Sequence, residues 1–346
     1  MTLFLANANS FHIETWKKIY ARLGQNEIDL ATVHAVPATQ DSFRSIVQVS
    51  VKSKIVAYAL LGLRLRASPA ISIHAHGASG YGLAARISGR PYIATIYGSE
   101  VLAAHGPLFR AMMRSILRNA RAITVTSTVA RDTIVRDFKV RPESIHVFHT
   151  GIDTDALDVM ATPIAAAADS SPDIIFSMRN TAATYRTREI VEACVELSQR
   201  GRRIMLVVPL GNGDRAYFED LRRAFAQEWI HYIDRRLENH EMLAWMKRAN
   251  VCVSFPETDQ MSTTILEALY VGHKVVAGRL EAYEELAAAL GDNTSLELVS
   301  DGRLARAIEA ALDGKEAESS ARAIKTNYGI EQAARNHARI LELLNG

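Results

Sequence analysis

The residues whose types and spacing best suit chemistry lie between Pro256 and Gly272, where we expect a loop followed by a short helix. Ser262 and Thr263 are residue types that cap helix N-termini, and Gly272 suits the left-handed position after a helix end. Backbone amides at a helix start favour anions. Glu267 comes four residues after Thr263, and helical side chains lean toward the N-terminus, so its carboxylate should flank this start. The segment therefore predicts a site for phosphates, with a carboxylate available to ribose hydroxyls.

Strand-like runs alternate with amphipathic helical patterns along the chain. In the first half, strands are predicted at 2–5, 28–36, 70–74, 92–97, 122–126 and 145–148. In the second half they are predicted at 174–177, 204–209, 230–233, 251–255, 274–277 and 296–299. Examples of predicted helices are 14–23, 109–119, 129–137 and a closing helix at 331–344. This alternation is typical of βαβ units and predicts an α/β fold with parallel sheets.

One stretch breaks the alternation and divides the chain. Residues 161–172 hold two prolines, no aromatic residue and one charge, so they are the predicted linker. We expect two Rossmann-like, doubly wound domains, at 1–160 and 173–329, with the closing helix 330–346 packing back on the first. A ligand cleft is expected between them, at the carboxyl ends of both sheets.

The composition is that of an ordinary globular protein. Cys194 and Cys252 lie far apart in apolar surroundings, which indicates buried free thiols in a reducing compartment. The start of the chain, 1–8, has the pattern of a first strand and not of a signal peptide. No apolar run reaches the length of about 18 residues that crosses a membrane. We therefore expect a cytoplasmic protein.

The net charge of +2 hides an asymmetry between the two halves. Residues 1–150 hold 18 Lys+Arg against 8 Asp+Glu, and the remainder holds 22 against 30. A basic half indicates an anionic partner, although solvated helix faces give the same count. Arg110, Arg114 and Arg118 recur every four residues on one helix, which suits either anionic lipid headgroups or solvent. We expect no nucleic-acid partner.

Several short segments, each weak alone, follow one another in a specific order. They are 5–12 with Trp16, 74–77, 97–100, 126–127, 150–153, Arg179, and 259–272. In this order and spacing the chain resembles the family 4 glycosyltransferases of the two-Rossmann-domain (GT-B) type. The resemblance extends over nearly the whole chain.

The resemblance implies roles for the residues of the segment described first. Such enzymes usually carry two glutamates with seven residues between them; Glu267 fills the second place, implied to bind the ribose. The first place holds Asp259, implied to face the donor sugar with a shorter reach, and Glu257 is its rival. The residues after the first acid are implied to contact the donor: Gln260, Met261, Ser262 and Thr263.

Arginines after the first strand of the second half suit a diphosphate. Arg179 follows that strand, and the planar fork of a guanidinium binds two oxygens at once. Arg186 is the nearest cation where the family commonly has a lysine. In the first half, Tyr97 stands where the family often has a histidine. Because tyrosine does not titrate near neutral pH, we expect Tyr97 to bind or polarise the substrate, unless it only packs against a helix.

Acceptor contacts are expected from the first half. His12 and His76 lie at strand–loop junctions, and Ser99 and Glu100 follow Tyr97 in a segment that matches the family. His74 is interpreted as an interior histidine with satisfied hydrogen bonds.

The implied reaction is the metal-independent, retaining transfer of a hexose-type sugar, with no cofactor. The donor would be a UDP- or GDP-linked sugar, and the acceptor a hydroxyl of a glycan or lipid-linked molecule in surface polysaccharide synthesis. Two alternatives remain: a sugar-nucleotide 2-epimerase of the same fold, and a non-catalytic two-domain sugar-binding protein. A peripheral contact between the basic first domain and the inner face of an anionic membrane is also expected.

Overall fold

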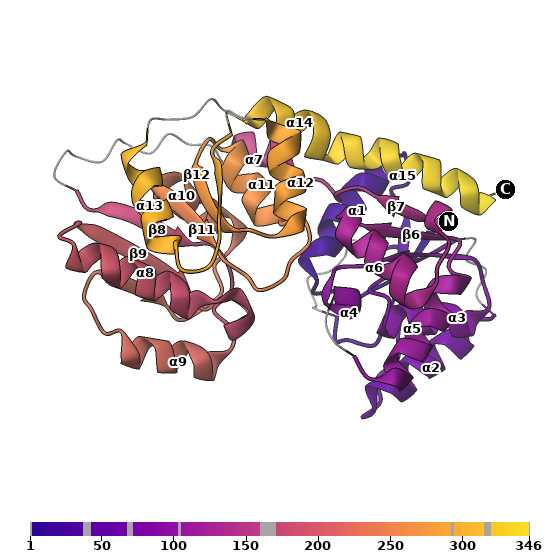
Figure 1. Cartoon of the computed structure of the whole chain (residues 1–346). Coiled ribbons are helices and arrows are strands. Elements are labelled where there is room, and N and C mark those ends of the chain that lie inside the picture. The colour runs from indigo at the N-terminus through magenta and orange to yellow at the C-terminus, as the bar shows by residue number, and fades with distance from the viewer. Residues whose placement is uncertain are drawn as a thin grey trace. The chain divides into compact units, whose positions relative to one another are not determined.

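The structure is a computed structural model that describes residues 2–36, 43–67, 72–102, 105–159, 171–291, 294–314 and 320–345. The chain divides into two compact units, Met1–Gly151 with Gly329–Gly346, and Ile152–Tyr328 (Figure 1). Most of the predicted linker lies outside the described residues. The second unit begins at Ile152 and not after residue 160, because Ile152 and Leu157 pack in its hydrophobic core.

The first unit is built on a parallel sheet. Within the described residues its strand order is β3-β2-β1-β4-β5-β6-β7. The strands are β1 (Thr2–Leu5), β2 (Ile28–Thr32), β3 (Ser45–Gln48), β4 (Ser72–His76), β5 (Tyr92–Thr95), β6 (Ala122–Val125) and β7 (Ile145–Val147). The helices are α1 (Phe11–Arg22), α2 (Lys54–Leu65), α3 (Gly80–Ser88), α4 (Ser99–Leu102), α5 (Pro107–Asn119), α6 (Thr128–Phe138) and α15 (Ile330–Asn345). A short 3₁₀ turn, Pro142–Ser144, precedes β7.

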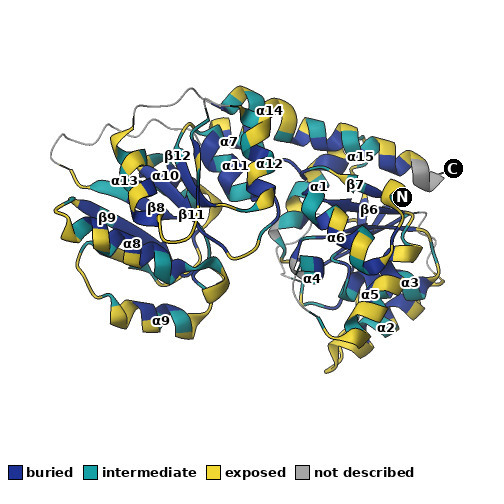
Figure 2. Ribbon diagram, in the orientation of Figure 1, coloured by how far each residue is buried: buried dark blue, intermediate teal, exposed yellow. Residues whose placement is uncertain are grey.

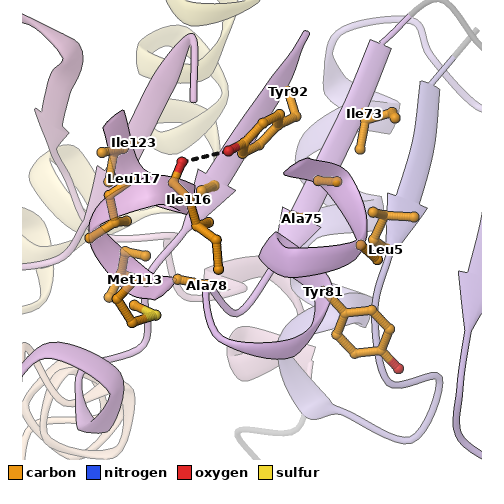
Figure 3. Close-up of a cluster of buried hydrophobic side chains, with 14 of the residues drawn as sticks. Leu5, Ile73, Ala75, Ala78, Tyr81, Tyr92, Met113, Ile116, Leu117 and Ile123 are labelled. Atoms are coloured by element: carbon orange, nitrogen blue, oxygen red, sulfur yellow. Dashed lines mark hydrogen bonds between the residues drawn. The ribbon is translucent and has the colours of Figure 1, made fainter. Parts of the chain in front are cut away.

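Helices cover both faces of this sheet, as its alternating apolar side chains require. Leu3 and Leu5 of β1 belong to the core cluster shared with α2, α3, α5 and α6. Phe4, between them, belongs to the cluster shared with α1 and α15. Figure 3 shows part of the first cluster, where the hydroxyl of Tyr92 donates to the backbone carbonyl of Ile116. Both faces are therefore sealed, and the strand ends are left for binding.

The closing helix completes the first unit. The predicted return of this helix to the first domain is confirmed, since α15 packs on α1 and Glu331 pairs with Arg22 at 3.0 Å. Where the chain leaves the unit, Gly151 has φ 86°, and a Cβ there would lie 2.9 Å from the Cα of Ile330. Only glycine therefore permits the close approach of the leaving and returning segments.

The second unit repeats the architecture. Within the described residues its parallel sheet has the order β10-β9-β8-β11-β12-β13. The strands are β8 (Asp173–Ser177), β9 (Ile204–Pro209), β10 (Ile230–Ile233), β11 (Val251–Ser254), β12 (Lys274–Gly278) and β13 (Leu296–Val299). The helices are α7 (Thr154–Val159), α8 (Thr187–Gln199), α9 (Arg215–Ala224), α10 (Asn239–Arg248), α11 (Thr263–Tyr270), α12 (Glu281–Leu290), α13 (Leu304–Asp313) and α14 (Ala321–Tyr328), with a 3₁₀ turn at Ala183–Tyr185.

Its helices also form two layers, and local signals fix their ends. The clusters on the two faces of the sheet hold α8, α9 and α13 on one side, and α10, α11, α12 and α14 on the other. Asp214 accepts hydrogen bonds from the amides of Ala216 and Tyr217 and so starts α9. Gly272 has φ 88° after α11, which confirms the left-handed stop predicted for it.

The predicted α/β fold with two doubly wound sheets is confirmed, and the differences lie at element ends. The fourth strand runs to His76 instead of ending at His74, and β2 ends at Thr32 instead of residue 36. β3 and α2 lie in a stretch to which the sequence patterns assigned no element. Cys194 and Cys252 are buried free thiols, as predicted. Within the described residues, no helix combines the length and the apolar character needed to span a bilayer.

Candidate functional site

In the second sheet the strand order reverses between β8 and β11. The chain adds β9 and β10 on one side of β8, and then β11, β12 and β13 on the other side. Ligands of doubly wound sheets bind at such a switch point, outside the carboxyl ends of the strands. Arg179 follows β8, and the loop 255–262 follows β11 and leads into α11. The two segments that the sequence singled out thus meet where this fold offers a site.

Arg179 and Asp259 form one bonded network at this point. A guanidinium nitrogen of Arg179 lies 2.9 Å from Oδ2 of Asp259 and donates to the hydroxyl of Ser262. The guanidinium also stacks 4.7 Å above the ring of Tyr185. Burial is the largest single influence and would lower the pKa of Arg179, but Asp259, Tyr283 and Tyr185 together outweigh burial and raise it. The arginine is therefore a fixed cation at the carboxyl edge of the sheet.

Tyr283, from the first turn of α12, contacts the same oxygen of Asp259 that Arg179 contacts. Its hydroxyl donates to Oδ2 of Asp259 at 2.8 Å, and Oδ1 accepts the amide of Gln260 at 2.9 Å. The side chain of Tyr283 is fully buried, and burial together with the negative charge of Asp259 raises its pKa well above the usual value. Tyr283 therefore stays protonated and positions Asp259, which positions Arg179.

We predict that Tyr283→Phe separates positioning from stability. Loss of one hydrogen bond to a charged group should lower the unfolding free energy by about 1–2 kcal/mol. It should also lower kcat about tenfold by loosening Arg179. Tyr232→Phe is the control, because its hydroxyl donates to backbone carbonyls near the end of α9. Urea unfolding and steady-state turnover check this; equal kcat in the two variants would contradict the positioning role.

The start of α11 lacks a side-chain cap. Ser262 occupies the N-cap position, yet it makes no capping hydrogen bond, and its hydroxyl accepts from Arg179 instead. The side chains of Gln260, Met261 and Ser262 are buried. A ligand at this end of α11 would therefore meet backbone amides and the edge of Arg179, with Thr263 at the first helical position.

Glu267 lies in the middle of α11 with its carboxylate in a desolvated position. Burial raises its pKa to about 7. Within the described residues, no hydrogen bond or ion pair is recorded for this carboxylate. The side chain of Glu267 is half-buried, so its partly desolvated carboxylate is open to a ligand that donates hydrogen bonds, which suits the hydroxyls expected of a ribose.

The two remaining candidates of the second unit have different surroundings. Arg186 lies between Glu189 and Asp301, at 3.0 and 2.6 Å, and stacks 4.4 Å from the ring of Phe255. Its charge is already balanced there, and its role in donor binding stays a prediction. Glu257, the rival of Asp259, has an exposed side chain.

The first unit brings three predicted residues together at the carboxyl edge of its own sheet. The rings of His12 and Tyr97 stack at 4.2 Å, and the hydroxyl of Tyr97 lies 3.1 Å from Nδ1 of His76. Burial lowers the pKa of His12 to about 4 and that of His76 well below its usual value, and it raises the pKa of Tyr97. All three are neutral, so this cluster can exchange hydrogen bonds but holds no charge near neutral pH.

His74 and one oxygen of Glu100 have structural partners within the first unit. Both ring nitrogens of His74 have partners, Tyr20 at 3.1 Å and Thr95 at 2.7 Å, which confirms an interior histidine. Oε1 of Glu100 accepts from the amide of Ser79 at 3.2 Å and so orders the start of α3. Burial raises the pKa of Glu100, and its Oε2 is buried without a partner. The side chain of Ser99 lies outside the described residues.

Sequence reasoning missed His337 of α15, which packs beside His74 in the core of the first unit. Its ring lies 4.8 Å from Trp16 and 5.3 Å from His74, and both of its nitrogens are buried without partners. Burial lowers its pKa to about 3. The folded chain therefore keeps His337 neutral, whereas the unfolded chain takes up a proton below about pH 6.5.

His337→Leu should accordingly stabilise the protein more in acid than at neutral pH. Stability from a group with a lowered pKa is lost as pH falls from the unfolded toward the folded value. The gain over wild type should grow by about 2 kcal/mol between about pH 7 and pH 5. His240→Leu is the control, because His240 is exposed at the start of α10. Urea unfolding at both pH values checks this; a constant gain would contradict it.

Comparison with known proteins identifies the family of one region of the chain. Residues 21–156 match the sequence model of Glycosyltransferase Family 4. This region is a glycosyltransferase family 4 domain. No curated protein sequence matches the chain.

Solved structures show a likeness in fold that extends over both units of the chain. Anabaena HepE, crystallised with UDP and glucose, superposes with a TM-score of 0.81 at 12% identity, covering 99% of each chain. Sucrose-phosphate synthase from Thermosynechococcus elongatus gives 0.77 at 13%, covering 99% of this chain and 98% of that one. A UDP-forming trehalose-phosphate synthase from Burkholderia xenovorans gives 0.74 at 14%, covering 100% and 98%. The fold is therefore GT-B. Within the described residues, no group of three or more His, Cys, Asp or Glu side chains is arranged to hold a metal ion.

Proposed function

We propose that the chain is a retaining glycosyltransferase that moves a hexose-type sugar from a UDP- or GDP-linked donor to a hydroxyl group. The observation that carries this proposal is the network of Arg179, Asp259 and Ser262 at the switch point of the second sheet, beside the start of α11. The family 4 match over residues 21–156 and the likeness to HepE, which was crystallised with UDP, support it.

The donor would bind with its diphosphate on Arg179 and on the amides at the start of α11. Ser262 and Asp259 hold the guanidinium in place, so little reorganisation is needed when a phosphate arrives. Glu267 would accept hydrogen bonds from the ribose, because its carboxylate is desolvated and unpartnered among the described residues. Gln260, Met261 and Thr263 would contribute backbone groups near the sugar.

In this proposal Asp259 acts through Arg179. Both of its oxygens already accept hydrogen bonds from the protein. We therefore propose that the aspartate, one methylene shorter than the glutamate usual in the family, serves chiefly to hold the arginine. A contact between Asp259 and the donor sugar would use a carboxylate lone pair that accepts no hydrogen bond from the protein.

Catalysis would come from stabilising charge on the leaving diphosphate. Negative charge grows on its oxygens as the bond to the anomeric carbon breaks, and Arg179 with the α11 amides is placed to balance it. The leaving phosphate itself would take the acceptor proton. No protein carboxylate is assigned as the base in this scheme, and no metal or cofactor is assigned a step.

The acceptor would be a glycan or a lipid-linked molecule in surface polysaccharide synthesis, bound by the first unit. His12, Tyr97 and His76 form a neutral hydrogen-bonding cluster suited to sugar hydroxyls. Oε2 of Glu100, buried without a partner, is a further acceptor for a hydroxyl, with Ser99 beside it in sequence. We also propose a cytoplasmic location and a peripheral contact between the basic first unit and an anionic membrane.

The experiment that tests this function is donor turnover. The purified chain is incubated with UDP- and GDP-linked hexoses and a set of glycan and lipid-linked acceptors, and release of nucleoside diphosphate and the product anomer are measured. The proposal expects release from one donor class with retained configuration. Conversion of the donor to its 2-epimer without an acceptor would instead favour the epimerase. Thermal stabilisation by free sugars, with none by nucleotides, would favour a binding protein.

A further inference from the structure

Helix α2 of the first unit exposes apolar side chains along its outer side. Four of them remain largely exposed: Ile55 at 74%, Val56 and Leu63 at 48%, and Leu60 at 42%. Val56, Leu60 and Leu63 are spaced by four and three residues and so share one helix face, and Ile55 lies at its edge. The opposite face, with Ala57, Leu61 and Leu65, is buried in the core cluster of the unit. α2 is therefore apolar on both sides, and its outer side faces away from the core (Figure 2).

The charge around this face has a single sign. Residues 42–131 hold 12 Lys+Arg and one acid, Glu100. That acid contributes little to the surface, because its carboxylate orders the start of α3. Lys52 and Lys54 lie at the start of α2, Arg64 and Arg66 lie at its end, and all four are exposed. The apolar face is thus bordered by cations at both ends.

The neighbouring helix α5 adds charge in the same layer. α3 packs against both α2 and α5, so the three helices cover one face of the sheet. Arg110, Arg114 and Arg118 of α5 are exposed. The sequence marked these arginines as a lipid-facing candidate. Among the described residues, α2 exposes four large apolar side chains, and α5 adds Leu108, which is 87% exposed beside Arg110.

We propose that α2 lies in the interface of an anionic lipid bilayer. Ile55, Val56, Leu60 and Leu63 would enter the boundary of the acyl chains, while the lysines and arginines at the helix ends contact lipid phosphates. An exposed apolar face needs a partner, and here the bordering charge selects an anionic one. A second copy of the chain would place like charges against each other. This deepens the membrane contact proposed above and does not depend on sugar transfer.

Sedimentation with vesicles tests the proposal without donor or acceptor. The full chain should bind vesicles that contain phosphatidylglycerol and bind those of phosphatidylcholine alone far more weakly. Ile55→Asn should lower the partition coefficient about tenfold or more, because an apolar side chain leaves the acyl boundary. Val159→Asn, at a position 85% exposed on α7 of the other unit, should leave binding unchanged.

Charge is tested in the same assay. The double variant Lys52→Gln/Arg64→Gln should lower the partition coefficient on anionic vesicles about thirtyfold. This factor converts the free energy lost with two cations at about 1.4 kcal/mol per tenfold change. The control Arg306→Gln/Arg322→Gln removes the same charge from exposed positions of the second unit. Melting curves confirm folding, which exposed substitutions should preserve. The proposal is overturned if Ile55→Asn binds like wild type, if both charge pairs have equal effects, or if Ile55→Asn only abolishes self-association in sedimentation equilibrium.

Discussion

Replacement of Arg179 by alanine is expected to lower kcat for glycosyl transfer by about 10²–10³-fold, the usual cost of removing one pre-placed donor to a developing negative charge. The guanidinium is held by Asp259 and Ser262 at the carboxyl edge of the second sheet, where the leaving diphosphate is proposed to lie. Steady-state release of nucleoside diphosphate measures this effect. The KM for the donor should rise as well, because the same cation contributes to ground-state binding.

Structural damage has to be separated from lost catalysis. Arg179→Ala leaves Asp259 partly buried without its cation and should lower the free energy of unfolding by about 2 kcal/mol. The loss is smaller than for a fully buried pair, because 15% and 19% of the two side chains are exposed to solvent. The double variant Arg179→Ala/Asp259→Asn should recover stability but not rate.

Arg202→Ala is the matched control. Arg202 pairs with Asp173 at 2.8 Å, and these side chains lie at the amino ends of β9 and β8, the opposite edge of the same sheet. This variant should lose stability and keep its kcat. If Arg202→Ala and Arg179→Ala slow turnover equally, the assignment of Arg179 is wrong.

Glu267→Gln is expected to trade nucleotide affinity for stability. The pKa of Glu267 is raised to about 7 by burial, against 4.5 for an exposed glutamate. A raised pKa means that the folded state binds the proton more tightly than the unfolded state does. The bound proton therefore adds to the free energy of unfolding below about pH 4.5, and this stabilisation is lost as pH rises through about 7. Removing the charge should therefore stabilise the protein by about 2 kcal/mol at about pH 8 and have little effect at about pH 4.

The same residue should make nucleotide binding pH-dependent. Only the ionised carboxylate accepts two ribose hydrogen bonds, so wild-type affinity for a nucleoside diphosphate should rise about tenfold between about pH 6 and pH 8. Glu267→Gln should bind about 10- to 100-fold more weakly at about pH 8. Comparison with the variant removes the titration of the ligand itself.

Glu297→Gln serves as the control for binding. Glu297 lies on the edge strand β13 with an exposed side chain. The affinity of Glu297→Gln for a nucleoside diphosphate should equal that of wild type at every pH. An unchanged pH profile in Glu267→Gln would remove Glu267 from the ribose site, whatever its effect on stability.

The placement of Arg179 and Asp259 follows from sequence because both come directly after strands that are neighbours in a doubly wound sheet. The topology alone brings the ends of β8 and β11 together. Tyr283 could not be found this way. Its hydroxyl reaches Asp259 from the first turn of α12, 24 residues along the chain, and the side chain that points there is selected by packing.

Two further features were missed for related physical reasons. His337 is one of several polar residues in an amphipathic helix. Trp16, the ring against which it packs, lies at the other end of the chain. α2 is apolar around most of its circumference, a pattern that predicts a buried helix, whereas the structure exposes Ile55 and Leu63. Patterns of hydrophobicity identify which residues are apolar, but the assembled layers decide which of them remain uncovered.

Titration calorimetry with nucleoside diphosphates tests the central claim most directly, namely that the carboxyl edge of the second sheet binds a sugar nucleotide. UDP and GDP are each titrated into the wild-type chain and into Arg179→Ala and Arg202→Ala, with free hexoses as the comparison. The account predicts one site for UDP or GDP, about tenfold or more weaker in Arg179→Ala and unchanged in Arg202→Ala. Binding of free hexoses without nucleotides, or nucleotide binding that ignores Arg179, would contradict it.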